Sequence, residues 1–323
     1  LVWQADTQAL NQGYPVLRPS PESMFAGGSG TSADPYQIAS AQQLNNVRWF
    51  LDDCFIQIAN IDLAEAPFNA GWLPIGMLPA ATVPFTGEFN GNGYIINNLT
   101  INLPGNQNTG LFWGLDMAHI INLSVLNANV SGGSRVGALA GSANLIYSYH
   151  CTAGGSVTGL NEVGGLFGAL DDHGSIIHCS FNGSVNGSGG SIGGLVGAAW
   201  DPGLEECSFS GSINGTGEDI GGIVGSSNST FLRECSVEAT ITGGSSHVGG
   251  LAGDSFQDTI ADCTVSGTIN SNALKVGGIL GKAQSVSIAR AVSLMQIEAG
   301  ELAGGLIGEC SASNVLNSYS RAS

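Results

Sequence analysis

A six-residue block of the form apolar-Gly-Gly-apolar-apolar-Gly recurs along most of this chain. Successive copies begin 27, 27, 29, 28, 28, 28 and 27 residues apart, a regularity that does not arise by chance. The eight copies, of which the first two are looser, begin at Thr109, Val136, Val163, Ile192, Ile220, Val248, Val276 and Ala303. Self-similarity at a period of about 20 to 50 residues is the signature of a repeat architecture, so this block constrains the fold more than any other feature.

Each repeat also contains a stretch in which apolar or small residues alternate with polar ones, as in 179–185 and 263–269. Alternation with a period of two is typical of a strand with one buried face. Helical repeats are disfavoured, because each glycine would cost about 1 kcal/mol inside a helix. One repeat is too short to bury its own apolar face, so equivalent strands must stack in parallel. The sequence therefore predicts an all-β parallel β-helix (β-solenoid) of about eight coils of 27–29 residues.

Composition limits the partners of such a solenoid. Charged residues make up 10% of the chain, and 25 acidic against 8 basic residues give a net charge of −17. Without a basic stripe we expect no nucleic-acid partner. No apolar run approaches the roughly 18 residues of a membrane span, so none is expected in this chain. The chain opens at Leu1 without a methionine, which we interpret as a processed form or a fragment.

Five of the seven cysteines recur every 28 residues, which in a solenoid places them above one another on an inward-facing column. This column consists of Cys151, Cys179, Cys207, Cys235 and Cys263. Cysteine behaves as a small buried hydrophobe, and Ala291 takes the next place, so we expect a packing role. Disulfides between adjacent coils are the alternative, although equivalent side chains on parallel strands point the same way and bridging would strain them. Cys54 and Cys310 lie off the column, and pairing of one of them between subunits is a further alternative.

The spacing of the titratable residues indicates no catalytic or metal-binding site. The five histidines lack metal-ligand spacing, and no CxxC motif or Cys/His cluster is present. Acidic pairs at 171–172, 205–206 and 218–219 fall at different places in their repeats, so we interpret them as solvated turns rather than as glycosidase carboxylates. Asp201 and Asp254 could join a structural calcium site, but the loop spacing of a calcium motif is absent. We expect no enzyme, no catalytic, cofactor-binding or metal residues and no cofactor, with structural calcium as the alternative.

The repeat resembles the GLUG motif, named for a Gly-Leu-any-Gly core that residues 165–168 match. The region before the repeats resembles the segment that usually precedes such motifs. Its matching stretches are 25–38, a short helix at 41–44, 58–63, 72–76 and 85–93. The resemblance covers about residues 24 to 320. It implies an N-terminal capping region and export to the surface in adhesin-like or S-layer-like proteins of bacteria and archaea, and it implies no catalytic residues.

Residues 1–18 resemble the piece that normally closes a GLUG array at its C-terminal end, yet here they come first. We divide the chain into this N-terminal segment (1–23), a β-rich cap with the first coils (24–103) and a GLUG-repeat solenoid (104–323). One interpretation is a slice of a longer tandem protein. The other is head-to-tail assembly, because an uncapped coil is a template for another chain. In that hypothesis the contact between subunits is made by Tyr14, Pro15, Val16 and Leu17.

Three functions compete. We expect a structural subunit of an extracellular filament, sheath or cell-surface layer, which assembles with itself head-to-tail as a homopolymer. The alternative is a cell-surface adhesin or glycan-binding module, which would need an exposed aromatic row. The aromatic candidates from the sequence are Trp113, Trp200 and Phe231, which do not occupy equivalent positions. A polysaccharide lyase or hydrolase is the weakest alternative, since it needs clustered carboxylates or basic residues in a groove.

Overall fold

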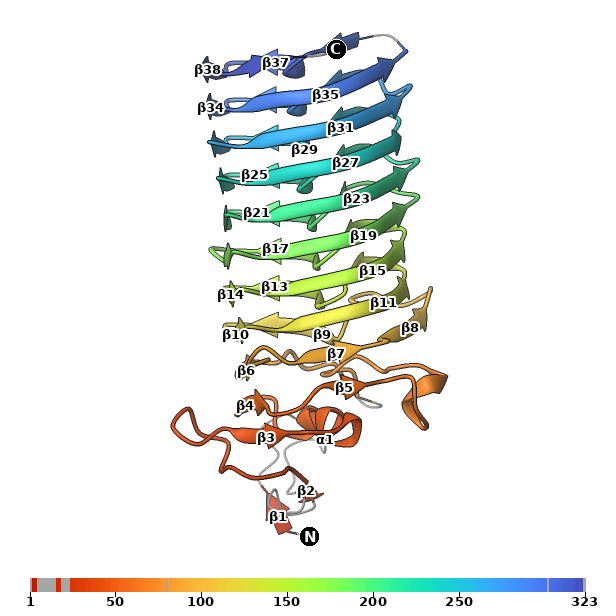
Figure 1. The fold of residues 1–323 in the computed structure, drawn as a ribbon, viewed down its shortest axis with the longest axis vertical. Helices are drawn as coiled ribbons and strands as arrows, with labels where there is room; N and C mark the ends of the chain where they lie inside the picture. Colours follow the sequence, from red (N-terminus) through yellow and green to blue (C-terminus); the bar gives the residue numbers. More distant parts are fainter. Residues whose placement is uncertain (1, 5–15, 19–23, 79–80, 301, 322–323) are drawn as a thin grey trace.

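The computed structural model describes residues 2–4, 16–18, 24–78, 81–300 and 302–321, the first two stretches through their backbone alone. The coils stack along one long axis, with the N-terminus at one end and the C-terminus at the other (Figure 1). Every strand pair in the four sheets of the stack is parallel and displaced by one coil. For example, Ser208 pairs with Ser236, and Ser236 pairs with Thr264. The predicted all-β parallel solenoid with one short N-terminal helix is therefore confirmed.

Four sheets, named I to IV in the order in which a coil meets them, form the walls of the solenoid. Sheet I contains β3 (Tyr36–Ile38), β4 (Cys54–Gln57), β6 (Glu88–Asn90), β10 (His119–Ile121), β14 (Tyr147–Tyr149), β18 (Ser175–Ile177), β22 (Gly203–Glu205), β26 (Phe231–Arg233), β30 (Thr259–Ala261), β34 (Ser287–Ala289) and β38 (Asn314–Leu316). Sheet II contains β5 (Ile61–Asp62), β7 (Ile95–Asn97), β8 (Thr100–Leu103), β11 (Ser124–Gly132), β15 (Thr152–Gly159), β19 (Ser180–Gly187), β23 (Ser208–Gly215), β27 (Ser236–Gly243), β31 (Thr264–Ser271), β35 (Val292–Ala299) and β39 (Tyr319–Ser320).

The two remaining sheets carry the GLUG-like block. Sheet III contains β12 (Ser134–Val136), β16 (Asn161–Gly164), β20 (Ile192–Gly193), β24 (Asp219–Gly221), β28 (His247–Gly249), β32 (Lys275–Gly277) and β36 (Leu302–Gly304). Sheet IV contains β9 (Phe112–Asp116), β13 (Ala140–Asn144), β17 (Phe167–Asp171), β21 (Val196–Trp200), β25 (Val224–Asn228), β29 (Ala252–Phe256), β33 (Leu280–Gln284) and β37 (Ile307–Ser311). The block Ile220 to Gly225 spans the turn from β24 to β25, so it joins sheet III to sheet IV.

Three glycines of this block allow three different close approaches. A Cβ on Gly221 would lie within 3.0 Å of the Val224 carbonyl, so the first glycine permits a tight turn. A Cβ on Gly222 would meet the side chain of Val237 from sheet II, so the second glycine makes room for a core side chain. The third, Gly225, lies against the backbone of Ile192 in the preceding coil. The motif therefore folds sheet IV tightly against sheet III.

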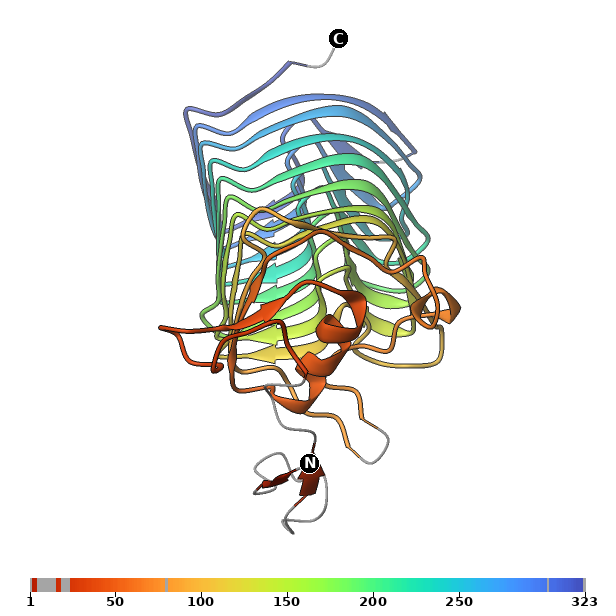
Figure 2. The ribbon, with the colours of Figure 1, turned by 60° about the horizontal axis from the view of Figure 1, so that its bottom comes forward.

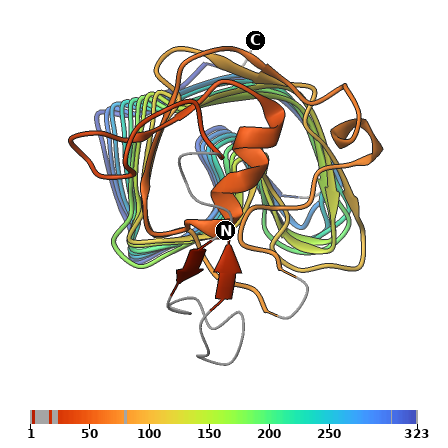
Figure 3. The same cartoon turned by 90° about the horizontal axis from the view of Figure 1, so that it is seen from below.

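The core consists of stacked columns of inward-facing side chains. From β6 to β34 the middle residue of each sheet I strand is buried, as are apolar residues at alternate positions of sheet II, which agrees with the period-two pattern. The sheet I column includes Ile176, Leu204, Leu232 and Ile260, all with no exposed surface. Burying one such side chain stabilises the fold by about 1.5–3 kcal/mol. Seen from below, the coils superpose closely, so each column continues through many coils (Figure 3).

The N-terminal end of the stack is covered by helix α1 (Ala41–Asn46), which lies across the first coils (Figures 2 and 3). Ser40 caps this helix by accepting a hydrogen bond from the Gln43 backbone N–H, and the Gln43 side chain accepts one from Ala39 at 2.7 Å. Leu44 of this helix is fully buried. Two 3-10 turns, η2 (Val47–Trp49) and η3 (Phe68–Ala70), complete the cap. None of the helices in the described stretches is long and apolar enough to cross a bilayer.

Candidate functional site

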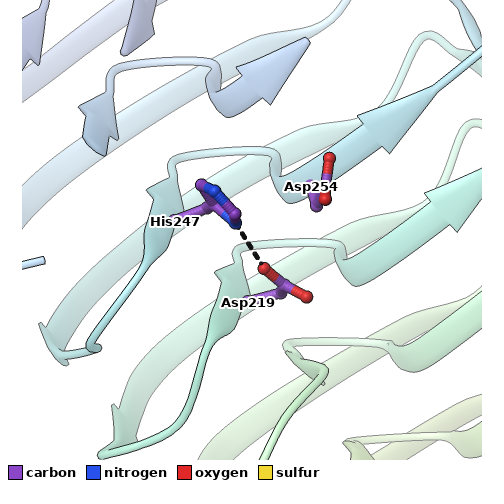
Figure 4. A group of neighbouring side chains, drawn as sticks. All are labelled: Asp219, His247 and Asp254. Carbon is purple, nitrogen blue, oxygen red and sulfur yellow. Dashed lines mark hydrogen bonds and ion pairs between the residues drawn. The ribbon is translucent and has the colours of Figure 1, made fainter. Parts of the chain in front are cut away.

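A line of ionisable side chains follows the junction of sheets III and IV. Sheet III contributes Asp219 and His247, which are register partners on β24 and β28. Sheet IV contributes Asp254 and Lys282, register partners on β29 and β33. Gly253 lies against the backbone of Asp219, so the close approach of the two sheets carries Asp254 to the Asp219–His247 pair. Figure 4 shows the three side chains of Asp219, His247 and Asp254 converging from neighbouring strands.

The distances in this group indicate strong polar contacts. Nδ1 of His247 lies 2.7 Å from Oδ1 of Asp219, and Nζ of Lys282 lies 2.9 Å from Oδ2 of Asp254. The side chains of Asp219 and His247 are each 17% exposed, and that of Asp254 is 24% exposed. The hydrogen bond to Asp254 raises the pKa of Lys282 above its ordinary value, although burial opposes this shift. An ion pair between Lys275 and Glu309 continues the line toward the C-terminal end.

The donor atoms of Asp219, His247 and Asp254 lie within 4.8 Å of one another. In the part of the chain that the structure describes, no other three His, Cys, Asp or Glu side chains converge in this way. The interpretation of 218–219 as a solvated turn is therefore wrong for Asp219, which begins β24 and is partly buried. The signal that could have revealed the group is the repeat itself. The 28-residue offset aligns Asp219 with His247 in one column and Asp254 with Lys282 in the next.

A second feature is a row of aromatic and imidazole rings on the outer face of sheet I, across β10, β14 and β18. We call it the aromatic–imidazole row, and it consists of His119, Tyr147, Tyr149, His150 and His178. The rings of Tyr147 and Tyr149 stack with centroids 6.1 Å apart. The centroids of His150 and His178 are 4.7 Å apart. His178 also lies 3.2 Å from the carboxylate of Glu206.

The sequence named other aromatic residues for an exposed row. Trp200 at the end of β21 is 37% exposed, and Trp113 and Phe231 are partly buried on β9 and β26. Restricting the candidates to these three was wrong, because the exposed rings that lie together are the tyrosines and histidines of sheet I. Histidines at positions 150 and 178 are one repeat apart, and that spacing was the overlooked signal.

The five repeated cysteines occupy the column expected for them, at the corner between sheets I and II. All five side chains are buried, and all seven thiols of the chain are free. The Cys207 thiol donates to the carbonyl of Glu205 at 3.2 Å and to that of Ile176 at 3.3 Å. Ala291 is buried at the next position of the column. Disulfides between adjacent coils are therefore not formed. Off the column, Cys54 is partly buried and Cys310 is exposed.

Burial and neighbouring thiols raise the pKa of three thiols in this column. Burial raises the pKa of the Cys179 thiol well above its ordinary value. Interaction with the Cys207 thiol raises the pKa of Cys235, and interaction with the Cys235 thiol, together with burial, raises that of Cys263. Because the thiolate is the reactive species, these shifts make Cys179, Cys235 and Cys263 less reactive than an exposed cysteine.

One carboxylate lies inside the core, at a position that no sequence pattern predicts as buried. Asp258 is 1% exposed and accepts hydrogen bonds from the Thr230 N–H at 2.7 Å and from the Ser227 hydroxyl at 2.5 Å. The Ser255 hydroxyl is a third donor. Burial raises the pKa of Asp258 to about 6, although these hydrogen bonds act in the opposite direction. Such donors allow a buried carboxyl group to be tolerated in a solenoid core.

The remaining candidates from the sequence do not form a site. Asp201 pairs with His173 at 3.1 Å, whereas Asp254 pairs with Lys282, so the two aspartates proposed for calcium have separate partners. Tyr14 and Pro15 lie outside the described residues. Val16 and Leu17 belong to β2 (Val16–Arg18), whose backbone pairs antiparallel with β1 (Val2–Gln4).

Known proteins share parts of the sequence of this chain, including its repeated motif. The GLUG motif matches residues 188–214 and 244–270. Halomucin of Haloquadratum walsbyi is 36% identical over 153 residues, 45% of this chain and 2% of that protein. A "Putative Gly-rich membrane protein" of Evansella cellulosilytica is 39% identical over 103 residues, 31% of this chain and 12% of that protein. The chain thus spans a small part of these relatives.

A solved structure has the same fold over most of its length. A Bacteroides ovatus protein, described as a "putative immunoglobulin A1 protease", superposes with a TM-score of 0.61 over 92% of this chain and 87% of the other. Its sequence identity is 20%, so this similarity concerns the fold alone. The motif matches and the parallel coils agree with each other. The chain therefore carries repeats of the GLUG motif on a β-solenoid fold.

Proposed function

We propose that this chain is a non-catalytic structural subunit of an extracellular filament, sheath or cell-surface layer, joined end to end through its solenoid. The observation that carries the proposal is the outer face of the coil formed by β36 to β39, which no other described segment covers. Strands β36, β37, β38 and β39 are each the terminal strand of their sheet within the described residues. Their outer edges present backbone N–H and C=O groups to which a further strand can pair.

The inward side chains of this coil favour another coil as the occupant. Val315 is 38% exposed, whereas its register partner Ile288 is 2% exposed and Ile260 in the next coil down is fully buried. Leu306 and Ile307 are partly buried, but Ile279 is fully buried. A stacked coil would cover this apolar surface and complete four backbone ladders at once. A contact between two different ends of the molecule propagates, so it builds a fibre.

The other end of the solenoid determines how a neighbour would bind. Helix α1 covers the first coils, so the N-terminal end presents no bare coil to the open face. In our proposal the segment before residue 24, which includes the paired strands β1 and β2, therefore makes the contact with the neighbouring copy. In our proposal this segment of one copy stacks on β36 to β39 of the next.

Electron microscopy of the full chain tests this proposal. We expect fibres with an axial repeat of one solenoid, and we expect both deletion of residues 1–18 and Val315→Asp to give isolated rods. Leu160→Asp is the matched control, because Leu160 is 51% exposed on the side of the stack and should leave the fibres intact. Fibres that persist in the deletion variant, or isolated rods from the unaltered chain, would contradict head-to-tail assembly.

A second function, binding of surface glycans by a cell-surface adhesin module, is favoured by the aromatic–imidazole row. Its rings lie on one outer face in three successive coils, with Tyr147 39% exposed. Aromatic side chains with a polar tip provide large, rigid contact surfaces at little cost in conformational entropy. This row satisfies the requirement for an exposed aromatic surface that the adhesin alternative makes.

A further inference from the structure

The group formed by Asp219, His247 and Asp254 has no part in the proposed assembly, because it lies on the side of the solenoid and away from both ends. We infer that these three side chains bind one divalent transition-metal ion, with Zn²⁺ as the representative ion. This inference goes beyond the proposed function and stands independently of it. It rests on the converging donor atoms, on the rigid strands that carry them and on the positive charge that already lies beside them.

The donor set fits zinc rather than calcium. One imidazole nitrogen and two carboxylate oxygens are ligands that Zn²⁺ takes, usually with a fourth position left to water. Calcium prefers six to eight oxygen ligands, and an imidazole in the group disfavours it. With His247 neutral, the two aspartates balance the double charge of the ion. The chemistry of the donors therefore selects a borderline-soft ion over a hard one.

The site is largely formed before any ion arrives. Asp219, His247 and Asp254 lie on three regular strands whose register is fixed by parallel pairing on both sides. Their donor atoms are already within 4.8 Å of one another, so small side-chain rotations suffice to close around an ion. Partial burial, with 17% of the Asp219 and His247 side chains exposed, limits competition from water while leaving access from solvent. Ligands held on strands in this way need little reorganisation.

Lys282 indicates that this position favours a cation. Its ammonium group lies 2.9 Å from the carboxylate of Asp254. A metal ion bound by Asp254 must displace this ammonium group. Its alternative partner is its register partner Glu309 on the next coil, which it would share with Lys275. Lys282 is thus a competitor for the site, and its removal should strengthen metal binding.

Calorimetric titration with Zn²⁺ tests the assignment, using the full chain without a histidine tag and with Cys310→Ser to remove the exposed thiol. We expect one ion per chain. His247→Ala and the nearly isosteric Asp254→Asn should each weaken binding at least about tenfold, since each removes a ligand. Lys282→Met should strengthen it about tenfold, because the competing charge is lost. His173→Ala, which disrupts an exposed His–Asp pair, is the control that should leave the affinity unchanged.

Co²⁺ provides a readout that reports the ligands directly. We expect visible absorption bands of a tetrahedral ion in the unaltered chain and their loss in His247→Ala, with circular dichroism unchanged in each variant. An excess of Ca²⁺ should not displace the ion. The assignment is overturned if no saturable one-to-one binding occurs, if His247→Ala and Asp254→Asn retain it, or if Lys282→Met weakens it.

Discussion

Gly194 lies so close to Phe209 that a Cβ at position 194 would come within 3.0 Å of the phenyl ring. The same Cβ would also meet the carbonyl oxygen of Gly222 in the next coil. At the second glycine of the repeated block, the turn between sheets III and IV therefore packs directly on a core side chain of sheet II. A backbone carbonyl cannot move aside as a flexible side chain can.

Gly194→Ala should therefore destabilise the fold. Overpacking of this kind costs about 1–3 kcal/mol of the free energy of unfolding, which urea denaturation would measure. Gly190→Ala is the matched control four residues away, since a Cβ there would meet nothing within 4 Å. A loss of stability as large in the control as in Gly194→Ala would show that the close approach is not the cause.

The buried carboxyl group of Asp258 should make stability depend on pH. Its pKa is about 6 in the folded chain against an ordinary value of 3.8, so the folded state retains a proton that the unfolded state releases. The free energy of unfolding should fall as the pH rises from about 4 to about 6, by about 3 kcal/mol in all. Asp258→Asn should remove most of this fall, as denaturation at pH 4, 5, 6 and 7 would show. Equal pH profiles for the two proteins would contradict the role of Asp258.

The thiols should react in two classes. Cys310 is exposed, whereas Cys151, Cys179, Cys207, Cys235 and Cys263 are buried, so a maleimide should label Cys310 rapidly in the native protein. Cys54 should react more slowly, because it is partly buried and burial raises its pKa. All 7 cysteines should react after denaturation, and mass spectrometry would locate the label. Rapid native labelling of Cys207 would show that the column opens to solvent.

The aromatic–imidazole row should be required if the chain binds glycans. Replacing both Tyr147 and Tyr149 by alanine removes the stacked pair and should reduce binding at least about tenfold on a glycan array, given that rings of this type supply anchor contacts. Tyr319→Ala is the control, because Tyr319 is 56% exposed on the last coil, outside the row. Unchanged binding in the double variant would assign recognition to another surface.

Much of the fold could be predicted because the repeat supplies both its period and its burial pattern. Cys207 and Leu204 could be placed on inward columns, since successive coils repeat a cysteine or an aliphatic residue at these positions. The sequence does not indicate which backbone or side chain each glycine of the block approaches. Only coordinates show that Gly225 contacts the backbone of Ile192, a contact between residues in different coils.

The candidate site was missed for a related reason. Asp219, His247 and Asp254 follow no motif with fixed local spacing, and each coil contributes only one or two of them. Asp219 and His247 become neighbours through register, but Asp254 reaches them through the packing of sheet IV on sheet III. That packing depends on Gly253, whose role a sequence pattern does not reveal. The burial of Asp258 could not be predicted for a similar reason, because its hydrogen-bond donors come from two coils.

The constant one-coil offset of the ladders has a genetic consequence. Residues 208 and 236 occupy equivalent positions in the backbone ladder, as do 236 and 264. The chain can therefore be cut and rejoined between such positions without altering the ladder. Unequal recombination within the gene would add or remove a whole coil in frame and change the rod by about 4.8 Å each time. The length of the solenoid can therefore change during evolution in steps of one coil, while the structures at its two ends stay the same.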